Sequence, residues 1–204
     1  VRPATRQKAI CHGYYVLFGV LGSGLIPALN KSWRDAYALS DTGIGLRISA
    51  SIGCFAAAAV LGGLIYDRWG PRAVMTWTAG LTAIGAAALA WARGPWAFLG
   101  ALLLFQVGNG LGCCINALVR GLYGSQRTRG LNLLHASQGL GRTLAPMAVA
   151  ASILLWGAHR PTLIASAVLM ALWAALFFAG LRDLPAHLDR PHAHAGDGPR
   201  RRPH

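Results

Sequence analysis

The sequence predicts an all-α membrane protein with six transmembrane helices. Of its 204 residues, 54% are hydrophobic and only 12% are charged, which is too apolar for a soluble domain of this size. Crossing the hydrocarbon core takes about 20 helical residues. Six apolar segments reach that length: 10–29, 43–65, 72–92, 96–119, 131–156 and 161–181. We therefore expect a six-helix transmembrane bundle over residues 10–181, between a cytoplasmic tail at 1–9 and a disordered basic tail at 182–204.

The loops differ in their content of lysine and arginine. If both termini are cytoplasmic, thirteen basic residues fall on the inside and five on the outside. Because loops rich in Lys and Arg stay in the cytoplasm, we expect both termini there and a bacterial inner (plasma) membrane around the bundle. Tryptophans near the outer ends of the spans are expected to anchor at the interface: Trp33, Trp91, Trp96 and Trp156.

The net charge of +13 follows from this topology. The basic residues lie in separate loops and tails, so the lipid bilayer is the expected partner and nucleic acid is not. The four cysteines lie in or beside apolar segments and predict neither disulfides nor zinc. Four tail histidines could bind a metal, although the composition favours a flexible tail: His187, His192, His194 and His204.

No enzyme chemistry is predicted. The chain has no pair of carboxylates inside a predicted span and no Gly-x-x-x-x-Gly-Lys-Ser/Thr loop for a nucleotide. We expect no catalytic residues, no metal and no cofactor.

A charged turn of about five residues joins the second and third predicted helices. Asp67 is predicted to lie where the following helix begins, at the positive end of its dipole. Gly63 is predicted to let two helix backbones approach. Gly70 supplies the turn residue, and Pro71 suits the first turn of the next helix.

This turn resembles the loop between helices 2 and 3 of the major facilitator superfamily of secondary transporters, Gly-x-Leu-x-Asp-Arg-x-Gly-Arg-Arg. The match is carried by Gly63, Asp67, Arg68, Gly70 and Arg72, with Pro71 in place of the first basic residue after the second glycine. The resemblance implies that the chain is one bundle of a two-bundle fold, its N-terminal half, built as a 3+3 inverted repeat. We expect either a fragment or a half that pairs with a second six-helix half, with Asp67 as a conformational latch.

The fourth helix contains three amides, Gln106, Asn109 and Asn116. Part of it resembles a second motif of the superfamily, Arg-x-x-Gln-Gly-x-Gly. Asn109 replaces the glutamine, and neutral Gln106 replaces the arginine that the family associates with proton coupling. These amides are candidates to line a solute cavity, and the alternative is that they only bond helices together. Residues 22–25 and 108–111 also form a faint internal repeat.

The fifth helix contains a polar stripe. Its members, Asn132, His135, Gln138 and Arg142, follow one another at steps of three, three and four, so they share one helical face over about 15 Å. Arg142 lies near mid-span, where an unpaired guanidinium costs at least a few kcal/mol, about 3 on the lowest scales. It therefore requires a cavity, a counter-charge or an anionic solute, and the alternative is a structural arginine bonded to helix-end carbonyls.

Residues 116–146 resemble the sugar-permease branch of the superfamily, near fucose permeases. The segment from Gly141 to Pro146 also resembles a weakened form of an antiporter motif. The acidic residues that sugar permeases use for protons are absent from these helices. The sequence thus predicts a secondary active transporter, or half of one, that moves a small polar or anionic solute by alternating access. The alternative is a six-helix fragment or scaffold that does not transport.

Overall fold

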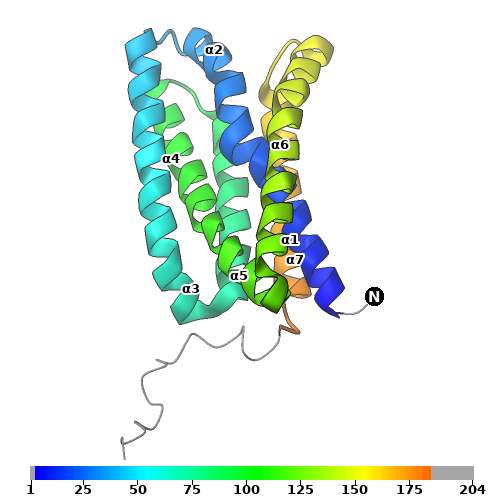
Figure 1. Ribbon diagram of the computed structural model, residues 1–204. Coiled ribbons are helices and arrows are strands. Elements are labelled where there is room, and N and C mark those ends of the chain that lie inside the picture. Colours follow the sequence, from blue (N-terminus) through cyan, green and yellow to red (C-terminus); the bar gives the residue numbers. More distant parts are fainter. Residues whose placement is uncertain (1–2, 185–204) are drawn as a thin grey trace, which may run out of the picture.

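The computed structural model describes residues 3–184, and every regular element within them is helical. Figure 1 shows these helices packed side by side along one common direction. The elements are α1 (Pro3–Phe18), the π-helical η1 (Gly19–Leu25), α2 (Ile26–Ala36), α3 (Asp41–Trp91), α4 (Pro95–Leu111), the 3-10 turn η2 (Gly112–Cys114), α5 (Ile115–Tyr123), the 3-10 turn η3 (Gly124–Gln126), α6 (Arg127–Trp156) and α7 (Arg160–Gly180).

Four helical stretches are long and apolar enough to cross a membrane: Ala4–Ala36, Asp41–Trp91, Pro95–Trp156 and Arg160–Gly180. Two of them contain 51 and 62 residues, far more than the roughly 20 that one crossing needs. In Figure 1 the chain reverses direction within each of these two stretches, once inside α3 and once between α5 and α6. The protein is an all-helical membrane bundle.

The predicted five-residue turn inside α3 is wrong in its extent. Helical geometry continues through Asp67 and Arg68 and resumes at Pro71, so the reversal is confined to Gly70. Gly70 has φ +78° and ψ 165°, a conformation open to glycine and strained for any residue with a Cβ. Pro71 follows directly because its fixed φ and missing N–H suit the first turn of a helix.

The first helical stretch is longer than the predicted span 10–29. It begins at Pro3 and reaches Ala36, with the π-helical η1 at its middle. Pro27 does not end it, since Pro27 lies in the first turn of α2, immediately after η1, where the regular i to i−4 pattern is already interrupted.

Large aromatic side chains fill the core between the helices. Tyr14, Phe98, Phe105 and Phe177 are all less than 2% exposed. Trp33 belongs to the same group with 0% exposure, and its ring centroid lies 5.1 Å from that of Phe98. The prediction of Trp33 as an interfacial anchor is therefore wrong, because its side chain is buried and contacts Phe98 of α4.

The first stretch packs closely against α6. A Cβ added to Gly141 would collide with the backbone oxygen of Val16, and one added to Gly19 would collide with the backbone oxygen of Gln138. Small residues of this kind let membrane helices approach at backbone distance. This contact fixes the position of α6 relative to η1.

The first segment of α3 and the outer face of α6 leave large apolar side chains uncovered. They include Val60 at 73% exposure, Leu64 at 67%, Met147 at 64% and Leu154 at 84%. Leu133, Leu140 and Leu144 of α6 are also exposed, on faces that can meet lipid or another helix.

The end of the described chain contacts its beginning. Leu181 is buried, the backbone oxygen of Asp183 accepts a hydrogen bond from Gln7 Nε2 at 3.0 Å, and the Asp183 carboxylate pairs with Arg6 at 3.4 Å. The first residues of the predicted disordered tail, 182–184, thus belong to the described chain and include Asp183. The rest of that tail, with His187, His192, His194 and His204, lies outside the described residues.

Candidate functional site

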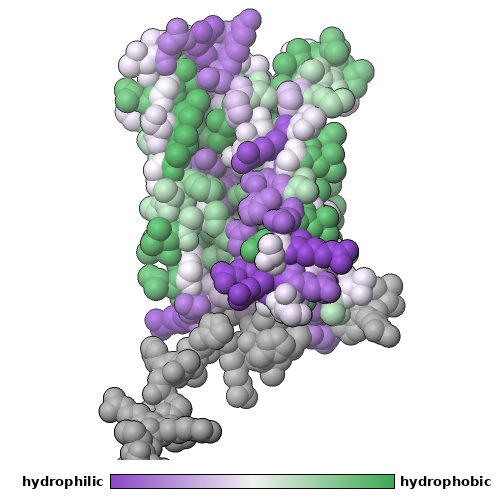
Figure 2. Space-filling model, viewed as in Figure 1, coloured by the Kyte–Doolittle hydropathy of each residue, from purple (hydrophilic) through white to green (hydrophobic). Residues whose placement is uncertain are grey.

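The polar stripe of α6 lies on the surface of the bundle. Asn132, His135 and Arg142 are exposed and Gln138 is half-buried. Figure 2 shows hydrophilic residues in a band along this face, with hydrophobic residues on both sides. The face carries polar groups at a depth where a membrane helix normally presents apolar ones.

Arg142 is held by a side chain from another helix. It lies near the middle of the 30-residue α6, and its Nε donates to Ser23 Oγ of η1 at 2.7 Å. Ser23 in turn donates to the backbone oxygen of Gly19 at 3.3 Å. Among the described residues the ion pairs involve Arg6 and Arg34, so Arg142 has no carboxylate partner there. Its terminal amino groups thus stay available for a ligand.

The π-helical η1 brings Ser23 to Arg142. A Cβ on Gly24 would collide with that of Ala145 and come within 3.3 Å of Arg142 Cα, so the backbone of η1 lies directly against α6. π-helical turns are rare and are frequent at functional sites. Sequence analysis missed Ser23, although the run Gly22-Ser23-Gly24 marks a place where a helix can approach closely.

His135 contacts the first helix through its ring. Its centroid lies 5.9 Å from that of Tyr15 in an edge-to-face arrangement, and buried Tyr15 stacks on Phe18 at 5.0 Å. Edge-to-face contacts of this kind orient a ring without using its polar atoms. Within residues 3–184 no hydrogen bond uses the imidazole nitrogens of His135, so they are available to bond a solute.

Gln106 and Asn109 lie inside the bundle rather than on the open face. They are 3% and 0% exposed, and Asn109 Nδ2 donates to Phe105 O at 3.0 Å. Asn109 Oδ1 has no partner among the described residues and lies 3.2 Å from the Cβ position of Gly22. The two stretches of the faint repeat therefore pack against each other, and cavity lining by these amides stays a prediction.

Asn116 occupies the junction of η2 and α5. Its Nδ2 donates to the backbone oxygen of Cys113 at 3.0 Å, and within residues 3–184 its buried Oδ1 has no hydrogen-bond partner. An amide oxygen left without a partner in an apolar site is costly, which makes Asn116 a candidate to accept from a ligand.

The residues around Gly70 are placed differently from the prediction. Asp67 is exposed in the last turn of the first α3 segment and not at the start of the second. A Cβ on Gly63 would meet nothing within 4 Å, whereas one on Gly62 would lie 3.0 Å from Cys114 Sγ, so Gly62 makes the close approach. Successive residues of a helix point in directions about 100° apart, so Gly62 faces the bundle while Gly63 faces outward.

Arg72 joins the turn to α7. Its Nε donates to the backbone oxygen of Phe178 at 2.8 Å, and its guanidinium lies 4.3 Å from the centre of that ring. Arg68 is exposed. Among the described residues no group of three or more His, Cys, Asp or Glu side chains could hold a metal ion.

Long apolar helices that bury an aromatic core and expose an arginine-bearing polar stripe define an integral membrane protein of the helical-bundle class. The family model described as Major Facilitator Superfamily matches residues 13–203, so the chain belongs to that superfamily. Its members are transporters rather than enzymes, and membership indicates a membrane transporter. A search of curated proteins finds no match to this sequence.

Proposed function

We propose that the chain is a secondary active transporter, or half of one, that moves a small polar or anionic solute by alternating access. The observation that supports this most directly is Arg142, an exposed guanidinium at the middle of α6 whose single hydrogen bond within the described chain runs from Nε to Ser23. An arginine at this depth is costly beside lipid, so a solute or a carboxylate of a facing bundle is its natural partner.

The membrane topology in this proposal has six crossings. Gly70 divides α3 and the 3-10 turn η3 divides α5 from α6, which separates the long stretches into segments of transmembrane length. With six crossings both termini lie on one side, and the excess of basic residues assigns that side to the cytoplasm of a bacterium. The resulting bundle is one N-terminal half with a 3+3 inverted repeat.

A second six-helix half, from the same or another chain, completes the proposed transporter. The uncovered apolar faces of α3 and α6 flank the polar stripe, as expected for a surface that another bundle covers. The solute would then lie between the halves, in reach of His135, Gln138 and Arg142. The likeness to fucose permeases favours a sugar-like solute, while Arg142 favours an anionic one.

The test is uptake of labelled monosaccharides and small carboxylates into proteoliposomes that hold the chain together with its partner half. Arg142→Ala is expected to reduce uptake about tenfold or more, because the loss of a hydrogen bond to a charged group weakens binding by about that factor. Arg142→Lys keeps the charge but loses the forked donors, so it should retain part of the activity.

Arg129→Ala is the matched control, since Arg129 is an exposed arginine near the start of the same helix. It should transport like the wild type. Uptake by Arg142→Ala at the wild-type rate would contradict the proposed role, and an assembled wild type that moves none of these solutes would favour a scaffold.

A further inference from the structure

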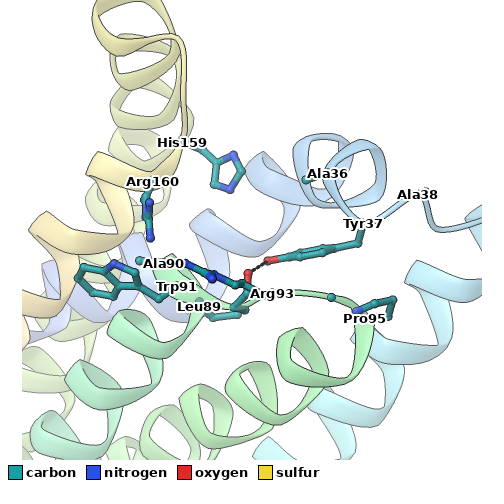
Figure 3. Close-up of a pocket in the computed structure, with 12 residues that line it drawn as sticks. Ala36, Tyr37, Ala38, Leu89, Ala90, Trp91, Arg93, Pro95, His159 and Arg160 are labelled. Carbon is teal, nitrogen blue, oxygen red and sulfur yellow. Dashed lines mark hydrogen bonds between the residues drawn. The ribbon is translucent and has the colours of Figure 1, made fainter.

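A separate pocket of about 620 Å³ opens at the end of the bundle where α2 and α6 terminate. It is formed by the end of α2, the end of α3, the loop into α4 and the junction of α6 and α7. Figure 3 shows His159 and Arg160 entering it from the α6–α7 junction and Arg93 entering it from the α3–α4 loop. None of these residues belongs to the stripe on α6.

The pocket carries positive charge from two arginines, Arg93 and Arg160, and no acidic residue lines it. His159 also lines it, but burial lowers the pKa of its imidazole and favours the neutral form. The two acids at this end of the described chain, Asp35 and Asp41, are both held by Arg34, at 3.3 and 2.8 Å. Within residues 3–184 the remaining pair, Arg6 with Asp183, lies at the opposite end, so Arg93 and Arg160 have no carboxylate partner.

Two contacts fix the walls. The guanidinium of Arg160 lies 5.3 Å from the centre of the Trp91 ring, which holds its position by a cation–π interaction. Tyr37 Oη donates to the backbone oxygen of Ala92 at 3.3 Å and ties the end of α2 to the α3–α4 loop. In the same loop Gly94 has φ +88°, a turn conformation that suits glycine. These contacts hold the α3–α4 loop and the Arg160 side chain in place around the pocket.

The geometry points to a site for a phosphate-type oxyanion, either free phosphate or the phosphate of a lipid headgroup. Guanidinium groups present forked donors that match the oxygens of phosphate, and two of them line this pocket. Trp91 is 54% exposed beside the pocket and Trp156 is 63% exposed on the adjoining helix, as is common at the level of lipid headgroups. The site is independent of the proposed transport function.

The test uses the full chain in dodecyl maltoside, with ionic strength matched by chloride because salt screens exposed charges. One arm adds inorganic phosphate. The other adds phosphatidylglycerol to the micelles and compares it with diacylglycerol, which has the same chains without the phosphate. The readout is the thermal unfolding midpoint as a function of ligand concentration, since a ligand that binds the folded state raises it.

The wild type should be stabilised by inorganic phosphate, by phosphatidylglycerol but not diacylglycerol, or by both. Stabilisation by inorganic phosphate identifies a soluble anion, and stabilisation by phosphatidylglycerol alone identifies a headgroup. The variant with Arg93→Gln and Arg160→Gln should bind about tenfold or more weakly, as expected on losing charged hydrogen bonds. Arg160→Lys, which keeps the charge, should lose less.

Lys31→Gln is the matched control, because Lys31 is an exposed cation at the same end that does not line the pocket. It should bind like the wild type. The proposal is overturned if neither phosphate nor phosphatidylglycerol stabilises the wild type, or if the double variant responds as the wild type does.

Discussion

Asp67 carries a negative charge where its helix disfavours one. It lies in the last turn of the first α3 segment, at the negative end of the helix dipole, and it has no ion pair among the described residues. Helix capping therefore does not explain it, and the latch remains the better hypothesis. Asp67→Asn should lower transport about tenfold, which is within the usual range of coupling between conformational states. It should raise the unfolding midpoint slightly, because it removes a charge that the helix dipole disfavours.

Asp41→Asn is the contrasting control for Asp67. Asp41 lies in the first turn of the same helix, where the dipole favours it, and it pairs with Arg34 at 2.8 Å. Its loss should lower the unfolding midpoint slightly and leave transport intact. The measurement is uptake by both variants in proteoliposomes that contain the partner half. An unchanged rate for Asp67→Asn would contradict the role of Asp67 as a conformational latch.

The residue spacing in α6 was enough to predict a polar stripe, but not its anchor. Steps of three and four place His135, Gln138 and Arg142 on one face wherever the helix packs. Ser23 was not predicted as the partner of Arg142, because it lies 119 residues away in sequence and reaches α6 through a π-helical stretch that the residue spacing did not reveal. The binding roles of these side chains stay predictions.

At the scale of the element, the contact between the first helical stretch and α6 depends on a glycine. A Cβ on Gly141 collides with Val16 O, whereas one on Gly139, two residues away on the same helix, meets nothing within 4 Å. Gly141→Ala should thus destabilise the bundle by about 1–3 kcal/mol, the cost of overpacking. Gly139→Ala should be neutral or slightly stabilising, since alanine favours helix.

Thermal unfolding of the two variants in detergent measures this difference. Gly141→Ala should also weaken the bond between Arg142 and Ser23, because the helices must separate to admit the methyl group. If both alanine variants unfold at the same temperature, the close backbone contact does not stabilise the protein.

Helix limits were predictable where proline marks them. The start of α4 at Pro95 and of α7 beside Pro161 lie within a residue of the predicted spans, and α6 ends at Trp156 as predicted. The reversal in α3 was predicted as a loop because charged residues commonly mark loops. In the structure those residues are helical, and a single glycine with positive φ reverses the chain. The composition of the segment does not indicate so short a turn.

For the whole molecule, the proposed topology predicts which positions a membrane-impermeant thiol reagent can reach. In a version with the four native cysteines replaced, Trp69→Cys and Gln126→Cys should be protected in intact cells, because the proposed topology places the Gly70 turn and η3 in the cytoplasm. Ala38→Cys, in the exposed turn between α2 and α3, should be labelled from outside. Labelling of residue 69 or 126 from outside would reverse the orientation.

The wide turn of η1 allows the first helical stretch to twist. Seven residues there follow π geometry, whose i to i+5 bonds take more residues per turn than the i to i+4 bonds of the α-helix. Converting one such turn to α geometry would rotate α1 against α2 by ~100°, the share of one residue in a 3.6-residue turn. Such a rotation would turn Ser23 away from Arg142 and release the guanidinium, and the side chains on one side of η1 would have to repack.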